Sequence, residues 1–127
     1  MKFESSAPIF TVNDVAATMR WYEDVLGFHS NPFPANPPYV FGIMNRSGVE
    51  IMLQRLEGYA KPNLYDTRPG GVWDLYVRLT GIRELYDAIV NRGDVPVLEP
   101  LHRQPYHQIE FVIRDPNGYV LVFGEET

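Results

Sequence analysis

The feature that most constrains the fold of this chain is an approximate internal repeat. A β-rich stretch at residues 8–12 leads into an amphipathic stretch that ends at Gly27, and residues 75–79 lead into a second amphipathic stretch that ends at Gly93. The copies lie about half the chain apart, which indicates that one supersecondary unit was duplicated because neither copy could bury its apolar face alone. Two such units usually leave a concave seam between them, and small ligands favour such seams.

Length and composition indicate one globular domain. The chain has 127 residues, of which 45% are hydrophobic and 21% charged. The net charge of −5 argues against a nucleic-acid partner, because nothing would neutralise a row of phosphates. The absence of cysteine excludes disulfides, thiolate zinc sites and thiol nucleophiles. No apolar run approaches the roughly 20 residues of a membrane span, and residues 1–6 lack the apolar core of a signal peptide, so we expect a cytoplasmic protein without a membrane partner.

Hydrophobic periodicity predicts a βαβββ order in the first half. A strand over residues 8–12 is followed by a helix for which Asn13 is the expected N-cap and Gly27 the left-handed stop. The later strands are expected as a short edge strand within residues 28–38 and a hairpin formed by residues 39–44 and 49–55.

The second half repeats this order. A strand over residues 72–79 leads into a helix that Thr80 caps and that ends at Gly93. The remaining strands are expected over residues 95–98, 107–114 and 119–124, with a turn that contains Pro116 and Gly118. Residues 57–71 form a polar connector, so module one spans about 1–56 and module two about 72–127. The predicted fold class is α+β with a largely antiparallel sheet in each half.

Three segments carry a further signal, namely residues 12–15, 21–28 and 114–123, in which an aromatic-Tyr…Leu-Gly-Phe helix end is combined with Asp-Pro-Asn-Gly. Together they resemble the vicinal oxygen chelate superfamily, which includes glyoxalase I, bleomycin-resistance proteins, fosfomycin-resistance transferases and extradiol dioxygenases. The resemblance covers nearly the whole chain. It implies duplicated βαβββ modules that form a curved, cup-shaped mixed sheet with helices outside, a ligand held in the cup, and a homodimer.

In the metal-binding members of this family, four side chains face the cup, usually two His and two Glu. The resemblance places Ala7 and Asp74 at the His positions and Val122 at one Glu position, while the other falls on Glu50 or Met52, which share one strand face. Ala7 and Val122 offer no lone pair, and two carboxylates alone would hold only a weak, hydrated Mg²⁺ or Ca²⁺. We therefore expect no metal cofactor; a divalent-metal-dependent lyase, isomerase or dioxygenase is the alternative that the resemblance leaves open.

Strand alternation indicates which side chains line the cup. Asp74 and Tyr76 are expected to face it, with the Asp74 carboxylate either aimed at a ligand cation or paired with a nearby arginine, and Trp73 is expected to pack under the second helix. Tyr39 and Phe41 are expected to share the face that lines the cup. An aromatic cup would bind a planar apolar ligand by stacking, unless its own side chains fill it.

His107 and Glu110 are a candidate acid/base pair at the start of a predicted strand, although a separation of three residues would point them to opposite sides. No catalytic residue is assigned. The sequence thus predicts a metal-free small-molecule-binding protein of the glyoxalase/bleomycin-resistance type that sequesters an organic ligand or antibiotic, and it leaves turnover open. The expected ligand-binding residues are Asp74, Tyr76, Glu50, Met52, Tyr39, Phe41, His107 and Glu110.

Overall fold

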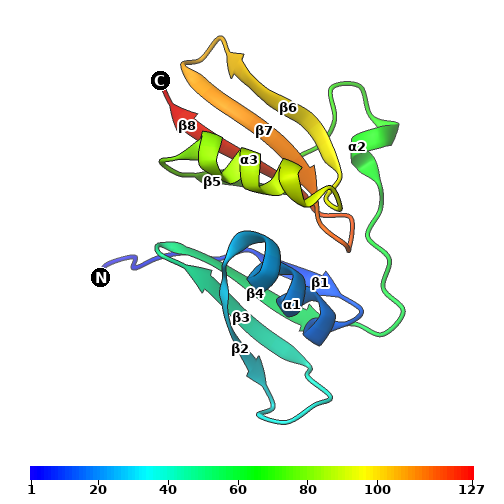
Figure 1. Ribbon diagram of the computed structural model, residues 1–127. Coiled ribbons are helices and arrows are strands. Elements are labelled where there is room, and N and C mark those ends of the chain that lie inside the picture. The colour runs from blue at the N-terminus through cyan, green and yellow to red at the C-terminus, as the bar shows by residue number, and fades with distance from the viewer. The chain divides into compact units, whose positions relative to one another are not determined.

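The computed structural model describes residues 1–127, and the chain divides into two units, Met1–Lys61 and Pro62–Thr127. These units divide the predicted connector between them, and from here on module one and module two mean these two units. Each module contains a four-stranded mixed sheet and one long helix in the order βαβββ (Figure 1). The predicted duplication and fold class are therefore confirmed. None of the helices is long and apolar enough to cross a membrane.

Module one has its four strands in the order β1-β4-β3-β2, with β1 parallel to β4 and the other neighbours antiparallel. Strand β2 lies at the sheet edge, as the sequence predicts for this segment. The elements are β1 (Ile9–Val12), α1 (Val15–Leu26), β2 (His29–Phe33), β3 (Phe41–Arg46) and β4 (Val49–Arg55).

The N-cap of helix α1 lies one residue later than the sequence predicts. The side chain of Asp14 accepts a hydrogen bond from the backbone N–H of Ala17 at 3.0 Å, and this carboxylate is the N-cap. The prediction of Asn13 as the cap is wrong, because its side-chain oxygen instead accepts a hydrogen bond from the backbone N–H of Gly58 at 2.6 Å. The helix ends as predicted at Gly27, whose φ of 68° is left-handed.

The sheet of module one has one face under α1 and one face without a helix. A Cβ atom at Gly42 would lie 3.1 Å from the sulfur of Met19, so this strand position approaches α1 closely. Leu53 is the register partner of Gly42 and is fully buried on the same face. Alternation then places Glu50 and Met52 on the face away from α1.

Module two begins with a short helix in the segment that the sequence indicates as a connector. Its strands have the order β5-β8-β7-β6, with β5 parallel to β8. Strand β5 is shorter than the predicted strand and β6 is longer. The elements are α2 (Leu64–Thr67), β5 (Leu75–Arg78), α3 (Ile82–Arg92), β6 (Val97–Gln104), β7 (Gln108–Arg114) and β8 (Val120–Glu126).

Helix α3 receives its N-terminal cap from a distant strand. The predicted cap, Thr80, is wrong, because the N-cap residue is Gly81 and no side chain next to it in the sequence makes the capping bond. Instead, the Glu125 carboxylate in β8 accepts hydrogen bonds from the backbone N–H groups of Gly81 and Ile82 at 2.8 and 2.9 Å. This anion compensates the unpaired donors at the positive end of the helix. The helix ends at Gly93, as predicted.

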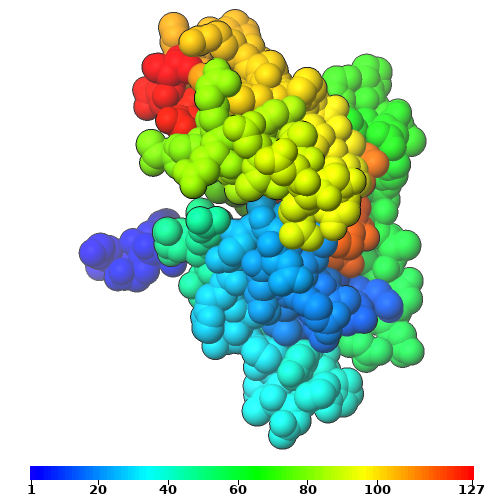
Figure 2. Space-filling model, in the orientation of Figure 1, coloured from blue at the N-terminus to red at the C-terminus, as the bar shows by residue number.

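The sheet of module two also has two different faces. Under α3, the ring of Tyr86 meets the edge of Phe111, and Phe111 stacks on Phe123, with 5.1 Å between the ring centroids in each pair. The other side of the sheet, which we call the open face of module two, carries a buried apolar cluster of Val112, Val120 and Val122, against which Tyr65, Tyr76 and Leu98 pack. In the space-filling view, the outer sides of α1 (blue) and α3 (yellow-green) lie at the surface (Figure 2).

Candidate functional site

A fully buried carboxylate, that of Glu110 in β7, is the centre of a polar cluster on the open face of module two. The hydroxyl of Tyr76 donates a hydrogen bond to Oε2 at 2.6 Å, and the hydroxyl of Tyr106 donates to Oε1 at 2.8 Å. The amide Nε2 of Gln104 donates to Oε1 at 3.1 Å. Three donors offset the desolvation of this carboxylate. We call Tyr76, Gln104, Tyr106 and Glu110 the Glu110 network.

The sheet order explains how these side chains meet. Strand β8 separates β5 from β7, so the Tyr76 side chain must cross β8 to reach Glu110. At the crossing point β8 carries Gly124, the register partner of Glu110. A Cβ atom at Gly124 would lie 2.7 Å from Cζ of Tyr76, which no real structure tolerates without a shift. The glycine therefore makes the hydrogen bond from Tyr76 in β5 to Glu110 in β7 possible.

The phenols of the network stay protonated at neutral pH. Burial, followed by the hydrogen bond to Glu110, raises the pKa of Tyr106 to about 12. The same two causes hold the pKa of Tyr76 well above its usual value. Both hydroxyls are therefore hydrogen-bond donors and poor proton acceptors. The Tyr76 hydroxyl also lies 3.3 Å from the side-chain oxygen of Gln108.

A second carboxylate on this face has a similar partner. The hydroxyl of Tyr65 in α2 donates to Oε2 of Glu99 at 2.8 Å, and burial together with this bond raises the pKa of Tyr65 to about 12. Nε2 of His102 lies 3.9 Å from Oε1 of Glu99 and 3.0 Å from Nε2 of Gln104. His102 and Gln104 therefore link the Glu99 cluster to the Glu110 network.

Tyr76 in β5 and Asp74 just before β5 are predicted ligand-binding residues with clear structural partners. Tyr76 lies on the open face, as alternation predicts. Asp74 precedes β5, and its Oδ2 accepts a hydrogen bond from the backbone N–H of Val120 at 2.8 Å. This carboxylate therefore helps to hold the start of β8.

The predicted position of Trp73 is wrong. Its side chain is 40% exposed, and its ring centroid lies 6.2 Å from that of Tyr76. The prediction extended strand alternation to this residue, but β5 begins only at Leu75, so the alternation does not reach it.

His107 is not among the hydrogen-bond partners of Glu110, with which it was expected to form an acid/base pair. His107 lies in the β6–β7 turn with φ of 63° and an exposed side chain. The hydrogen bonds of Glu110 go to the donors of the Glu110 network instead. The pairing fails because His107 is a turn residue, whereas the prediction placed it in the strand.

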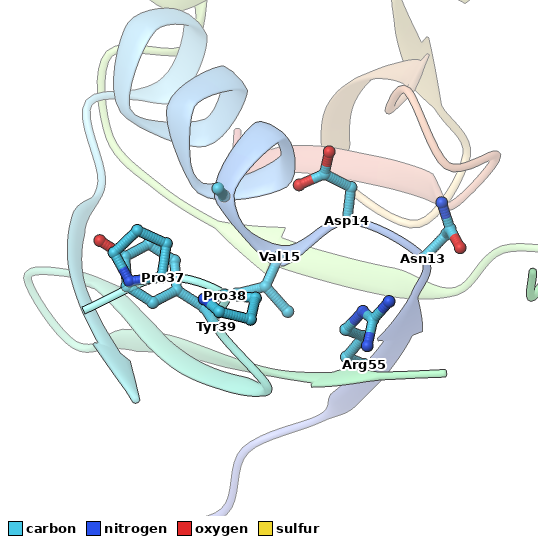
Figure 3. Close-up of a pocket in the computed structure, with 8 residues that line it drawn as sticks. Asn13, Asp14, Val15, Pro37, Pro38, Tyr39 and Arg55 are labelled. Carbon is cyan, nitrogen blue, oxygen red and sulfur yellow. The ribbon is translucent and has the colours of Figure 1, made fainter. Parts of the chain in front are cut away.

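The predicted residues of module one do not form one group. Phe41 alternates with Gly42 in β3 and therefore lies on the face away from α1, with Glu50 and Met52. Tyr39 precedes β3 and lines a hollow at the first turn of α1 (Figure 3). The expected shared face of Tyr39 and Phe41 is not found, since alternation holds only within the strand.

This hollow in module one has a volume of about 280 Å³ and lies where the first turn of α1 meets the β2–β3 loop and the end of β4 (Figure 3). Its polar groups already have structural partners. Asp14 caps α1, and Asn13 accepts the hydrogen bond from Gly58. The hollow is therefore a weaker candidate for a ligand site than the open face of module two. Its lining residues are Asn13, Asp14, Val15, Ala16, Pro37, Pro38, Tyr39 and Arg55.

The residues at the family's metal positions do not fit a transition-metal ion. Val122 is fully buried in the apolar cluster, and the Asp74 carboxylate already binds a backbone N–H group. No three His, Asp or Glu side chains of the chain gather closely enough to hold a metal ion. A stable site needs three or four converging donors, and these side chains supply too few. Alternation still does not decide between Glu50 and Met52 for the remaining position.

The sequence analysis missed several site residues. Gln108 lies two positions before Glu110, so alternation from Glu110 could have found it. Gln104 pairs with Gln108 across the hairpin, which required the register. Glu99 and Tyr65 carried no periodic signal, because Tyr65 lies in the connector segment and β6 has an irregular register near Glu99.

Two βαβββ modules, each with a mixed sheet and one covering helix, define a paired-module α+β protein. The chain belongs to the Glyoxalase/Bleomycin resistance protein/Dioxygenase superfamily, which it matches over residues 7–123. This confirms the family resemblance that the three sequence segments indicate.

Virulence protein STM3117 of Salmonella typhimurium is 28% identical to this chain over 120 residues, which cover 92% of this chain and 80% of the relative. A glyoxalase-related enzyme from Clostridium phytofermentans has a TM-score of 0.78 and 17% identity, with 100% of this chain and 98% of that chain covered. The bleomycin-binding protein of Streptomyces verticillus, solved with copper(II)-bleomycin, has a TM-score of 0.67 and 20% identity, with 97% and 96% covered. At such identities the two structural likenesses show the fold alone.

Proposed function

We propose that this protein binds a small organic molecule on the open face of module two, without a metal ion, and sequesters it rather than converting it. The observation that carries this proposal is the Glu110 network beside the apolar cluster of Val112, Val120 and Val122. An apolar floor next to a few fixed polar groups is the usual composition of a small-molecule site. The fold shared with a bleomycin-binding protein agrees with this class of function.

The chemistry of the network favours binding over turnover. Glu110 already accepts three hydrogen bonds, so little of its capacity remains to take a proton from a substrate. The raised pKa of Tyr106 makes its phenol a poor base at neutral pH. We therefore expect the network to hold fixed dipoles against a ligand rather than to transfer protons.

The experiment is a thermal-shift screen of small organic molecules, including metal-free bleomycin, in the presence of EDTA. A ligand at one hundred times its Kd should add about 2.7 kcal/mol, or on the order of 10 °C in Tm for a domain of this size. Loss of all binding in EDTA, a stoichiometric Ni²⁺, Zn²⁺ or Mn²⁺ ion in the purified protein, or a changed mass of the ligand after incubation would each overturn the proposal.

The homodimer and the cytoplasmic location stay predictions. A homodimer would cover the unpaired strand edges that each open sheet leaves. Light scattering at micromolar concentration tests the dimer, and a monomeric mass would contradict it.

A further inference from the structure

One side chain of the short helix α2 contacts the open face of module two. In this helix Leu64, Asp66 and Thr67 are exposed, whereas Tyr65 is partly buried. Its ring packs against the apolar cluster of Val112, Val120 and Val122. The segment that carries Tyr65 therefore covers part of the proposed binding face.

The contacts of Tyr65 are those that a bound phenol would make. The ring contacts an apolar floor, and the hydroxyl donates to the Glu99 carboxylate at 2.8 Å. An ionised carboxylate only accepts hydrogen bonds, so this position selects a donor at the end of a flat ring. Gly71 also approaches the ring closely, because a Cβ atom at this position would lie 2.6 Å from Cε2 of Tyr65. The backbone at Gly71 and the apolar cluster therefore both contact this aromatic ring.

The attachment of α2 to the rest of module two is slight. Arg114 in β7 pairs with Asp66 at 3.1 Å, and the side chain of Asp66 is 52% exposed. The Arg114 guanidinium also lies 5.9 Å from the ring centroid of Tyr65. An ion pair of this exposure contributes little stability, so displacement of Tyr65 would cost mainly its own ring contacts and its hydrogen bond.

We propose that the seat of Tyr65, formed by Val112, Val120, Val122 and Glu99, is a binding subsite for a planar aromatic group with a hydrogen-bond donor, and that Tyr65 occupies it in the free protein. The ligand enters as Tyr65 leaves. This inference rests on the proposed function and names the class of ligand that the face accepts. Since the competent state is only partly populated, the occupied seat lowers the apparent affinity of the wild-type protein.

The test uses p-cresol, which is the side chain of tyrosine, and toluene, which lacks the hydroxyl. Calorimetry should find p-cresol bound at least about tenfold more tightly by Tyr65→Ala than by the wild type, because no ring must be displaced. In Tyr65→Ala, toluene should bind about tenfold more weakly than p-cresol, and Glu99→Met in the same background should abolish that difference. The matched control is Tyr59→Ala, which removes a partly buried tyrosine of module one outside every candidate site and should leave the affinity for p-cresol as in the wild type.

Two further variants keep the test decisive if Tyr65→Ala does not fold. Tyr65→Phe loses the hydrogen bond to Glu99, and Asp66→Ala loses the ion pair to Arg114 together with the hydrogen bond that Asn63 donates within α2 and its cap. Both should raise the affinity for p-cresol above that of the wild type, and NMR shifts of the methyl groups of Val112, Val120 and Val122 should report the binding.

Equal affinities for p-cresol in the wild type and the Tyr65 variants, or equal affinities for p-cresol and toluene in Tyr65→Ala, would overturn the inference. If that happens while a ligand from the thermal-shift screen still binds, the subsite falls and the proposed function stands. If no ligand binds in either experiment, the proposed function falls as well.

Discussion

Replacement of Glu110 tests whether the Glu110 network holds the open face of module two together. Glu110→Gln keeps the size of the side chain and one acceptor oxygen, but it removes the charge that two phenols and one amide share. A hydrogen bond to a charged group contributes about 1.5–3 kcal/mol, against about 1 kcal/mol for a neutral one. Part of this difference is recovered, because Tyr106 is 49% exposed and its hydroxyl can bind water. We therefore expect Glu110→Gln to lower the free energy of unfolding by about 1–2 kcal/mol.

Glu110→Ala removes every acceptor and leaves a void in a fully buried position. The partly buried hydroxyl of Tyr76 then lacks its partner at 2.6 Å, so we expect a loss of about 3 kcal/mol. Urea unfolding, followed by circular dichroism, gives both values if the slope m is unchanged. The control is Glu50→Gln, an exposed carboxylate on a strand of module one, which should stay within about 0.5 kcal/mol of the wild type.

The coupling between the two main partners refines this test. In a double-mutant cycle, Glu110→Gln and Tyr76→Phe should show an interaction energy of about 1 kcal/mol, because the first weakens and the second removes the same hydrogen bond. A Glu110→Gln variant as stable as the wild type, or more stable, would refute the reasoning. It would mean that the desolvation cost of the carboxylate exceeds what its donors return, as happens for some buried charges.

Three further outcomes are expected from the structure. Burial raises the pKa of Tyr65 and Tyr106 to about 12, so the stability that their protonated hydroxyls contribute is complete below about pH 10, the usual pKa of a phenol, and is lost as pH rises toward 12. Urea midpoints should therefore fall between about pH 10 and about pH 12, and unchanged midpoints would contradict this expectation. Gly124→Ala should lower the free energy of unfolding by about 1–3 kcal/mol, because the added methyl group pushes the Tyr76 ring aside. When Tyr76 is also replaced by Ala, Gly124→Ala should cost much less, and strictly additive losses would contradict the passage of the Tyr76 side chain over Gly124. Asp74→Ala should lower the free energy of unfolding by about 1 kcal/mol and Asp74→Asn by less, because an amide oxygen still accepts the hydrogen bond from the N–H group at the start of β8. If Asp74→Asn weakens the binding of a cationic ligand but not that of a neutral ligand of the same shape, the carboxylate also interacts with the charge of the ligand.

The order of elements could be predicted because local signals and the repeat agree. Gly27 and Gly93 end their helices with φ of 68° and 74°, and Gly118 has φ of 92° in the last turn. These positions require a left-handed backbone, which glycine adopts without strain. Alternation then placed Tyr76 on the correct face of its sheet. Such features depend on neighbours in the sequence, so a single sequence is enough to recognise them.

The errors have a common cause, which is that they depend on where a strand stops or on a partner from far along the chain. Trp73 and Tyr39 lie just outside their strands, where alternation no longer applies. The cap of α3 comes from Glu125, which is 44 residues later in the sequence than Gly81. The parallel pairing of β5 and β8 brings it to the start of the helix. The donors of Glu110 also come from β5 and from the β6–β7 hairpin, and this meeting follows only from the sheet order.

The open face of module two uses one chemistry, a phenol that donates to a carboxylate, in two different mechanical settings. Tyr76 lies in β5, whose pairing with β8 fixes the backbone position from which its hydroxyl reaches Glu110, and its ring packs against the apolar cluster. Tyr65 lies on a four-residue helix whose other side chains are exposed, so its hydrogen bond to Glu99 can be exchanged for that of another donor at small cost. Under our proposal, Glu110 therefore maintains the shape of the face, whereas Glu99 distinguishes between ligands. A ligand that gained affinity from removal of Tyr76 rather than of Tyr65 would reverse this assignment of roles.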